Sequence, residues 1–498
     1  MNKLNDSNKF RMKCGAGIIA ITIFTASAAN NAAESPEMKV NEPLSFEKAV
    51  RAAQKNDPWL TGNVHKQRSI ESMSTAVNTL PTPKMSIGLA NLPTNGFDFG
   101  QEGMTQAKVG ISQMFPRGDT LEFKSQQLKI QSEAYPYQRK DRESKVTVTV
   151  GSLWLDAYRV QQSIALIEKN RSLFEQLADV AQASYSSALG KTRQQDIVRA
   201  QLELTRLEDR LDKLAQQKNH YEGKLSQWLT TFSTAKLSKI SNSIDGASLV
   251  ADLTLYNALH NIKLSQQLPQ INLLNPSFVY TESWLKVGEL VPYLSNHPSV
   301  IAVEKKINAT RTGVKLAKQK YKPEWGVNAS YGYRGDDPMG RSRADLFSVG
   351  VTFDLPIFTE NRQDNEVQSA ISKTEAMKTE KLLLLRQLLG AYSSAKGRLL
   401  RLIDRQDLYK KKLLPQIHDQ AEASLTAYTN DDGDFSEVVR SRIAVLNAEI
   451  DHLTLNVEEQ KILLELNYLL IGNINSAMTQ KKTNLANSNQ YAAIAGEK

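Results

Sequence analysis

The sequence predicts a mainly α-helical protein with a small transmembrane β part, built as a tandem structural repeat. Long stretches carry apolar residues at three- and four-residue spacing, which is the helical period, whereas four short stretches alternate apolar with small or polar residues, which is the strand period. Short motifs of the first half also return about 240 positions later, as Lys108–Phe115 returns from Ser348. Such self-similarity is the signature of an internal repeat.

Residues 1–28 are predicted to be a secretory signal. A basic segment leads into the apolar run GAGIIAITIFTASA, which ends in the cleavage motif Ala26-Ser27-Ala28. The run has roughly 14 residues, fewer than the roughly 20 that span a bilayer, so a cleaved signal is favoured over an anchor. The only cysteine, Cys14, lies in this segment. We therefore expect no disulfide and no cysteine ligand or nucleophile in the mature chain.

The rest of the chain divides into two halves of similar plan, each with a helix, a strand pair and a long helical hairpin. Asn56-Asp57-Pro58 near the start of the first half returns as Asn296-His297-Pro298. The predicted segments are the first repeat (29–230), an inter-repeat equatorial segment (231–284), the second repeat (285–472) and a polar C-terminal tail expected to be mobile (473–498).

The four predicted strands lie within 85–90, 109–112, 325–333 and 347–355. An ordinary soluble sheet also alternates in this way. The small and polar opposite face, and lengths near the 9–11 residues of a tilted transmembrane strand, favour strands that cross an outer membrane. The residues predicted to face the membrane are Met85, Ile87, Leu89, Val109, Ile111, Val327, Tyr331, Phe347, Val349, Val351 and Phe353.

Four strands cannot close a barrel, and an open edge in lipid leaves backbone groups unsatisfied at a cost of several kcal/mol each. Two copies of the chain supply eight strands, but a barrel of that size is filled by its own side chains. The glycine, serine and alanine residues opposite the apolar positions favour an open lumen instead. A homotrimer with about twelve strands in outer-membrane lipid is therefore predicted.

About a hundred residues of helical pattern follow each strand pair. Residues 120–190, interrupted at Pro136, would extend roughly 100 Å at the helical rise. Leucine stripes in the return helices are typical of coiled-coil packing and carry no chemistry. The hairpins are expected to turn within 187–196 and 427–437. The candidate partner-contacting residues at these tips are Gly190, Lys191, Arg193 and Gly433.

The chain resembles the TolC-like outer-membrane efflux factors over nearly its whole mature length. The resemblance rests on an N-x-P near the start of each half, a strand pair closing on V-G-x-x-x-x-x-P, and a return helix opening DIVRAQLEL or EVVRSRIAVL. It implies a trimeric outer-membrane β-barrel continued by a periplasmic α-barrel, acting as the passive channel of a tripartite efflux pump. The implied partners are a periplasmic adaptor (membrane fusion) protein and an inner-membrane pump of the resistance-nodulation-division type.

The periplasmic entrance in this family is narrowed by polar and acidic side chains at the hairpin tips. By position, Asp431, Asp432 and Asp434 are the candidate gate residues, and three-fold symmetry would favour cations there. A solvated, turn-forming aspartate cluster is the open alternative. The run MTQAKVGISQMFPRG resembles the heavy-metal branch, although the lipidated cysteine of many metal-pump relatives is absent. Small solutes such as heavy-metal cations or drugs are the expected cargo.

An enzyme is disfavoured because the histidines are scattered and no catalytic or metal-binding motif occurs, so no catalytic residue, metal or cofactor is expected. The net charge of +9 comes from basic residues interspersed with acidic ones, which is typical of solvated helix faces and not of a nucleic-acid partner. Two alternatives stay open. One is a type I protein-secretion conduit, and the other is a soluble periplasmic coiled-coil adaptor, although adaptors usually have one hairpin between soluble β domains.

Overall fold

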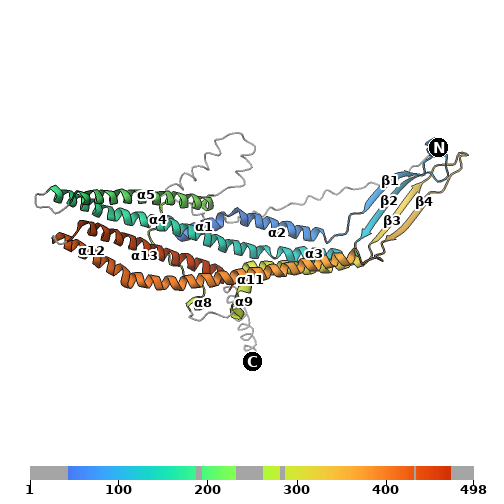
Figure 1. The fold of residues 1–498 in the computed structure, drawn as a ribbon. Helices are drawn as coiled ribbons and strands as arrows, with labels where there is room; N and C mark the ends of the chain where they lie inside the picture. Colours follow the sequence, from blue (N-terminus) through green and yellow to red (C-terminus); the bar gives the residue numbers. More distant parts are fainter. Residues whose placement is uncertain (1–42, 187–192, 231–261, 281–286, 431–432, 473–498) are drawn as a thin grey trace, which may run out of the picture. The chain divides into compact units, whose positions relative to one another are not determined.

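The computed structural model describes residues 43–186, 193–230, 262–280, 287–430 and 433–472, and Figure 1 shows their fold. These residues form long helices and one four-stranded antiparallel sheet, which confirms the predicted fold class in its helical and strand content. In chain order the elements are α1 (Phe46–Asn56), α2 (Pro58–Ala76), β1 (Lys84–Ala90), β2 (Gln106–Phe115), α3 (Thr120–Ser132), α4 (Tyr135–Ser186), α5 (Gln194–Leu229), α8 (Pro276–Tyr280), α9 (Val287–Ser295), α10 (Pro298–Lys318), the 3-10 helix η1 (Gln319–Tyr321), β3 (Trp325–Tyr333), β4 (Leu346–Phe353), α11 (Gln363–Leu408), the π-helical turn η2 (Tyr409–Leu413), α12 (Leu414–Thr429) and α13 (Phe435–Leu470).

The repeated N-x-P motif is a helix start in both halves. Helix α2 begins at Pro58, and the Asp57 side chain accepts a hydrogen bond from the Trp59 N–H at 3.0 Å. Helix α10 begins at Pro298, with His297 as its N-cap. Proline suits the first helical position because the N–H it lacks would have no partner within the helix. The motif therefore fixes where each of these helices begins.

Prolines also interrupt the long helical segments. Helix α3 ends at Ser132 and α4 begins at Tyr135, so the interruption predicted at Pro136 is confirmed. In the second half, Pro415 lies in the first turn of α12, directly after the π-helical turn η2. A proline ring clashes with the carbonyl four residues earlier, and a wider turn relieves that conflict. The local sequence pattern alone did not predict this turn.

The sheet has the strand order β1-β2-β3-β4 (Figure 1). Val109 of β2 is opposite Ile87 of β1 and Tyr331 of β3, and Tyr331 is opposite Phe347 of β4. Directly opposed residues project to the same side of a sheet. This register places all the residues predicted to face a membrane on one face of the sheet.

The helices enclose apolar cores away from the sheet. In one core, the fully buried Trp154 of α4 packs against Phe46 and Tyr158. The described part of the inter-repeat segment lies along these helices: Tyr158 donates a hydrogen bond to the Gln266 carbonyl, and the Ile271 N–H donates to Gln460 of α13.

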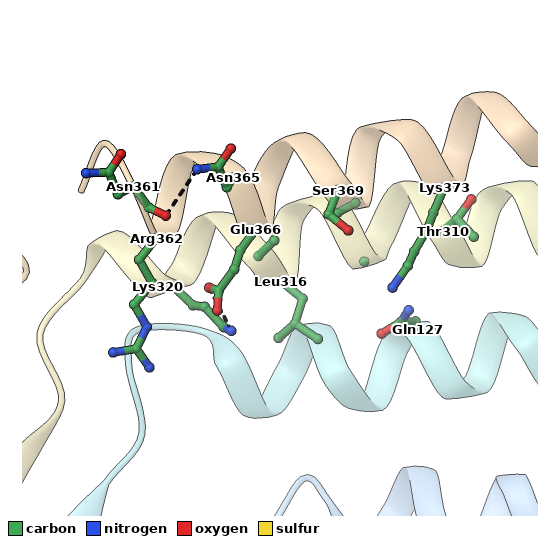
Figure 2. Close-up of a pocket in the computed structure, with 13 residues that line it drawn as sticks. Gln127, Thr310, Leu316, Lys320, Asn361, Arg362, Asn365, Glu366, Ser369 and Lys373 are labelled. Carbon is green, nitrogen blue, oxygen red and sulfur yellow. Dashed lines mark hydrogen bonds and ion pairs between the residues drawn. The ribbon is translucent and has the colours of Figure 1, made fainter.

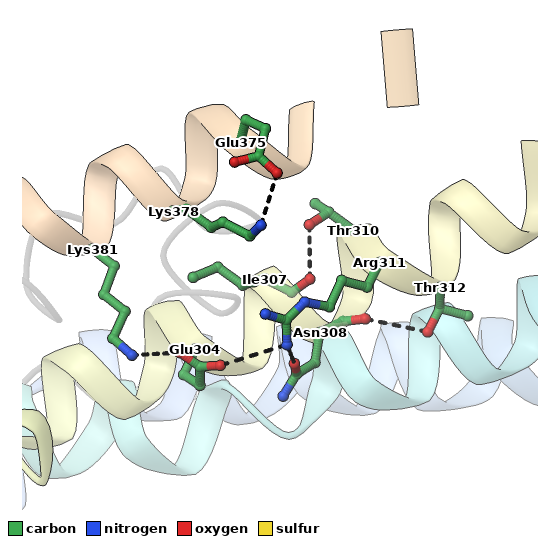
Figure 3. Close-up of polar contacts among 9 residues, drawn as sticks. All are labelled: Glu304, Ile307, Asn308, Thr310, Arg311, Thr312, Glu375, Lys378 and Lys381. Atoms are coloured by element: carbon green, nitrogen blue, oxygen red, sulfur yellow. Dashed lines mark hydrogen bonds and ion pairs between the residues drawn. The ribbon is translucent and has the colours of Figure 1, made fainter. Parts of the chain in front are cut away.

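Helices α10 and α11 pack against each other, and an ion pair joins them (Figure 3). Glu304 of α10 pairs with Lys381 of α11 at 2.7 Å and lies 3.9 Å from Arg311 of its own helix. Exposed pairs of this kind contribute little stability each.

Within the residues described, no helix is both long enough and apolar enough to cross a membrane.

Candidate functional site

One face of the sheet is apolar and exposed. Ile87 is 77% exposed, Phe347 72% and Val349 64%. A shallow hollow on this face is lined by Met85, Val109, Ile111, Tyr331 and Phe347, among others. A continuous apolar surface of this kind on a soluble monomer marks a place where lipid or another protein binds. The described residues of a single chain leave it uncovered.

The opposite face of the sheet carries mainly small and polar side chains, with Met114 and Leu346 as the larger apolar ones. Its positions are Lys84, Ser86, Gly88, Ala90, Gln106, Lys108, Gly110, Ser112, Met114, Gly326, Asn328, Ser330, Gly332, Leu346, Ser348, Gly350 and Thr352. The two faces therefore differ sharply in polarity, and small side chains on the second face leave room beside it.

The two loops at one end of the sheet are tied to each other. Arg343 donates hydrogen bonds to the carbonyls of Glu102 at 3.1 Å and Gly100 at 3.4 Å. Arg334 donates to the Gly103 carbonyl at 3.1 Å. These contacts join the β1–β2 loop to the β3–β4 loop, so this end of the sheet has a defined rim.

Charged residues join the two halves at the other end of the sheet, where strands continue into helices. Arg117, which follows β2, pairs with Asp354, which follows β4, and lies 3.8 Å from Glu324. Gly118 has a φ of +44°, and a Cβ there would lie 2.3 Å from the Lys322 side chain. Glycine adopts this backbone conformation without strain. The junction is thus built from residues far apart in sequence.

A groove of about 590 Å³ lies beside this junction, between α3, α10 and α11 (Figure 2). Its charged lining residues are Lys320, Arg362, Glu366 and Lys373. Lys320 forms an ion pair with Glu366 at 2.8 Å. The groove is therefore basic on balance, but it is shallow and open, and its one acidic group is already paired.

The structure describes only part of the site residues predicted at the hairpin tips. Gly190, Lys191, Asp431 and Asp432 lie outside the described residues. Asp434 is the N-cap of α13, and its Oδ1 accepts a hydrogen bond from the Ser436 N–H at 3.0 Å. That hydrogen bond holds the pKa of Asp434 below its usual range, and the charges of Arg199 and Arg193 add to the effect. Asp434 therefore stabilises the start of a helix and carries its charge close to two arginines.

The other described tip residues also have local structural roles. The Arg193 N–H donates to the Asp196 carboxylate at 2.9 Å, at the start of α5. A Cβ at Gly433 would lie 2.6 Å from the backbone nitrogen of Tyr428, so the chain passes too close to the end of α12 for any other residue. These contacts fix the start of α5 and the position of Gly433 against the end of α12. They do not test whether the tips bind a partner.

One of the scattered histidines, His297, is buried in the structure, which the sequence alone did not indicate. His297 is fully buried, its Nδ1 lies 3.2 Å from the Ser299 N–H, and its Nε2 lies 3.1 Å from the Tyr468 carbonyl. Nδ1 must accept and Nε2 must donate in this arrangement, so the ring is neutral. Burial lowers the pKa of His297, helped by the charge of Lys145 and opposed by Asp141 and the Tyr468 carbonyl.

This histidine predicts a loss of stability in mild acid. Because the pKa of His297 is lowered on folding, its contribution is complete above the unfolded pKa of about 6.5 and is lost as the pH falls toward the folded pKa. We expect the thermal unfolding midpoint of the detergent-solubilised protein to fall more steeply between about pH 7 and 5 than that of His297→Asn, which caps a helix without titrating. Equal slopes for the two proteins would contradict this prediction.

Among the described residues, no group of three or more histidine, cysteine, aspartate or glutamate side chains is arranged to hold a metal ion. The features that stand out are the two-faced sheet, its open edges and the hairpin tips. Together they suit a surface that assembles with other molecules.

No protein-family profile matches the chain, and no curated protein does. Solved structures match it over most of its length. CusC, described for transmembrane channel formation, is 12% identical with a TM-score of 0.64, covering 85% of this chain and 91% of that chain. The CmeC outer membrane channel of Campylobacter jejuni is 13% identical with a TM-score of 0.65, covering 86% and 85%. The MtrE outer membrane channel of Neisseria gonorrhoeae, in its open state, is 13% identical with a TM-score of 0.62, covering 85% and 88%. The chain therefore has the fold of these channels, and the predicted resemblance is confirmed for the fold.

Proposed function

We propose that this chain, which has the fold of outer-membrane channels, is the outer-membrane component of a tripartite efflux pump and acts as a passive conduit, not as an enzyme. The observation that carries the proposal is the uncovered apolar face of a four-stranded sheet whose opposite face is small and polar. Lipid covers the first face in this assignment, and an aqueous lumen lies beside the second.

Both edges of the sheet need partners in a membrane. Strands β1 and β4 are the edge strands, and lipid offers no hydrogen bonds to their free backbone groups. Pairing β4 of one copy with β1 of the next satisfies both edges. A homotrimer closed in this way has about twelve strands, enough to leave an open lumen.

The helices then extend into the periplasm. The hairpin tips, with Gly190, Lys191, Arg193 and Gly433, are the surfaces we assign to the periplasmic adaptor, which in turn contacts an inner-membrane pump of the resistance-nodulation-division type. Residues 231–284 are assigned to a belt around the helices, and the described ones contact α4 and α13. The expected cargo is a small solute, such as a drug or a heavy-metal cation.

Two alternative functions predict different properties for this chain. An exposed apolar sheet face is not expected on a soluble periplasmic adaptor, so the surface described above favours the channel. A type I protein-secretion conduit uses the same architecture with a different cargo. Export of a protein or of small solutes by cells that lack and then regain this chain distinguishes the two conduits.

The proposal is tested by recording single-channel currents from the purified trimer in a planar bilayer. We expect discrete openings, and we expect neutralisation of Asp431, Asp432 and Asp434 to asparagine to lower the preference for cations several-fold, because a ring of negative charges attracts cations at the entrance. Asparagine at 434 still caps α13. Asp419→Asn, an exposed position of α12 away from the tip, is the matched control.

The outcomes separate the conduit from the gate. Inserted trimers that never conduct would overturn the proposed conduit. If the pore conducts and its preference for cations is the same with and without the three aspartates, the proposed conduit is supported. The aspartates then serve only the turn and the helix cap.

A further inference from the structure

The polar face of the sheet carries a lysine close to the end where the loops join the strands. Lys108 of β2 is exposed and lies directly opposite Gly88 of β1 and Gly332 of β3. Gly110 is the next residue of its own strand on the same face. Three of the neighbouring positions on this face therefore have no side chain of their own. The space above Gly88 is open, whereas the side chain of Gln106 lies against Gly332 and that of Ser86 lies against Gly110, so the lysine stem has room on the β1 side.

This lysine has no acidic neighbour on its face of the sheet. The strand positions on that face contain two lysines, Lys84 and Lys108, and no aspartate or glutamate. Asp345, directly before β4, accepts hydrogen bonds from Tyr331 and the Arg334 N–H, and Asp354, directly after β4, pairs with Arg117. No ion pair of Lys84 or Lys108 occurs among the described residues, which include both loops of the sheet.

We propose that Lys108 makes the strand-lined part of the conduit selective for anionic solutes. This inference rests on the proposed function, because the polar face surrounds a lumen only when the sheet closes around one. Three copies then place three ammonium groups at one height of that lumen, each on an exposed side chain of the polar face.

The expected size of the effect follows from Coulomb's law. Three unit charges at about 10 Å from a monovalent anion in a water-like medium raise the local concentration of that anion about eight-fold without screening. Screening at about 0.1 M salt reduces this increase to about two-fold. A solute with a carboxylate, phosphate or sulfonate group is favoured in this region, and a free cation is opposed. The effect acts in the opposite sense to the aspartates at the hairpin tips and in a different part of the chain.

The test measures reversal potentials of single channels under a salt gradient for the wild type and three variants. Lys108→Gln is expected to shift permeability toward cations by about two- to eight-fold, and Lys108→Glu is expected to shift it further, since it reverses the sign of the ring. Lys108→Arg keeps the charge and is the matched control, with no shift expected. The shifts are expected to shrink as the salt concentration rises.

Three results are possible. Shifts in this order and with this salt dependence support the inference. A conducting pore in which all the variants have the selectivity of the wild type overturns it and leaves the proposed conduit standing. Assembled trimers that do not conduct at all overturn the proposed function, and this inference falls with it.

Discussion

Replacing Val109 with arginine is expected to prevent insertion of the trimer into the outer membrane while leaving the helices of each chain folded. Val109 lies on the apolar face of the inner strand β2, one residue pair from the middle of that face, opposite Ile87 and Tyr331, and is 43% exposed in the single chain. An arginine facing lipid at the bilayer centre costs about 2–4 kcal/mol. Because the trimer carries three such residues, the total reaches about 6–12 kcal/mol, which is comparable to the whole stability of many domains.

The measurement compares the amount of protein in the outer-membrane fraction with the helical circular dichroism signal of the purified chain. Ser348→Arg is the matched control, because Ser348 is on the polar face and is opposite Ser330. We expect the control to insert normally. Equal insertion of both variants would show that the apolar face does not contact lipid and would remove the main support for the proposed function.

Replacing Trp154 with alanine is expected to lower the free energy of unfolding by about 3–5 kcal/mol, the usual range for deleting a large buried aromatic side chain. Trp154 is fully buried, with the Phe46 ring at 5.8 Å and the Tyr158 ring at 5.5 Å. Its Nε1 donates a hydrogen bond to the Leu44 carbonyl at 3.0 Å. The side chain therefore joins the segment before α1 to the long helix α4.

A conservative variant separates packing from hydrogen bonding at this position. Trp154→Phe keeps most of the packing, and the Leu44 carbonyl still accepts a hydrogen bond from the Ser265 N–H at 3.2 Å. We therefore expect its cost to be only about 1–2 kcal/mol, close to that of one hydrogen bond plus a small loss of contact. Denaturant unfolding of the full chain measures both values. A change below about 1 kcal/mol for the alanine variant would contradict the role of this core.

Position 297 shows which structural properties the two repeats share and which they do not. Asp57 and His297 occupy equivalent places in the two halves, and both are helix N-caps as the N-x-P motif suggests. Their partners differ: Asp57 forms an ion pair with Arg142 at 2.7 Å, whereas His297 contacts the backbone of Tyr468. The motif predicts the helix start because a cap is a local property of the chain. The partner depends on which distant helix packs beside it.

The sequence by itself determined the elements of this protein. Strand alternation, helical spacing and the position of Pro136 predicted where strands and helices lie and which strand residues share a face, because these properties depend on residues a few positions apart. The two-faced character of the sheet follows from that alternation alone, since successive side chains of a strand point to opposite sides.

Only the tertiary structure decided how distant residues combine. The glycines around Lys108 come from β1 and β3, so they are neighbours only once the strand register is known. The ion pair between Arg117 and Asp354 and the contact of the buried His297 with Tyr468 likewise join residues far apart in the sequence. No local pattern encodes such contacts, because burial and electrostatic partners are set by the packing of elements that lie far apart in the sequence.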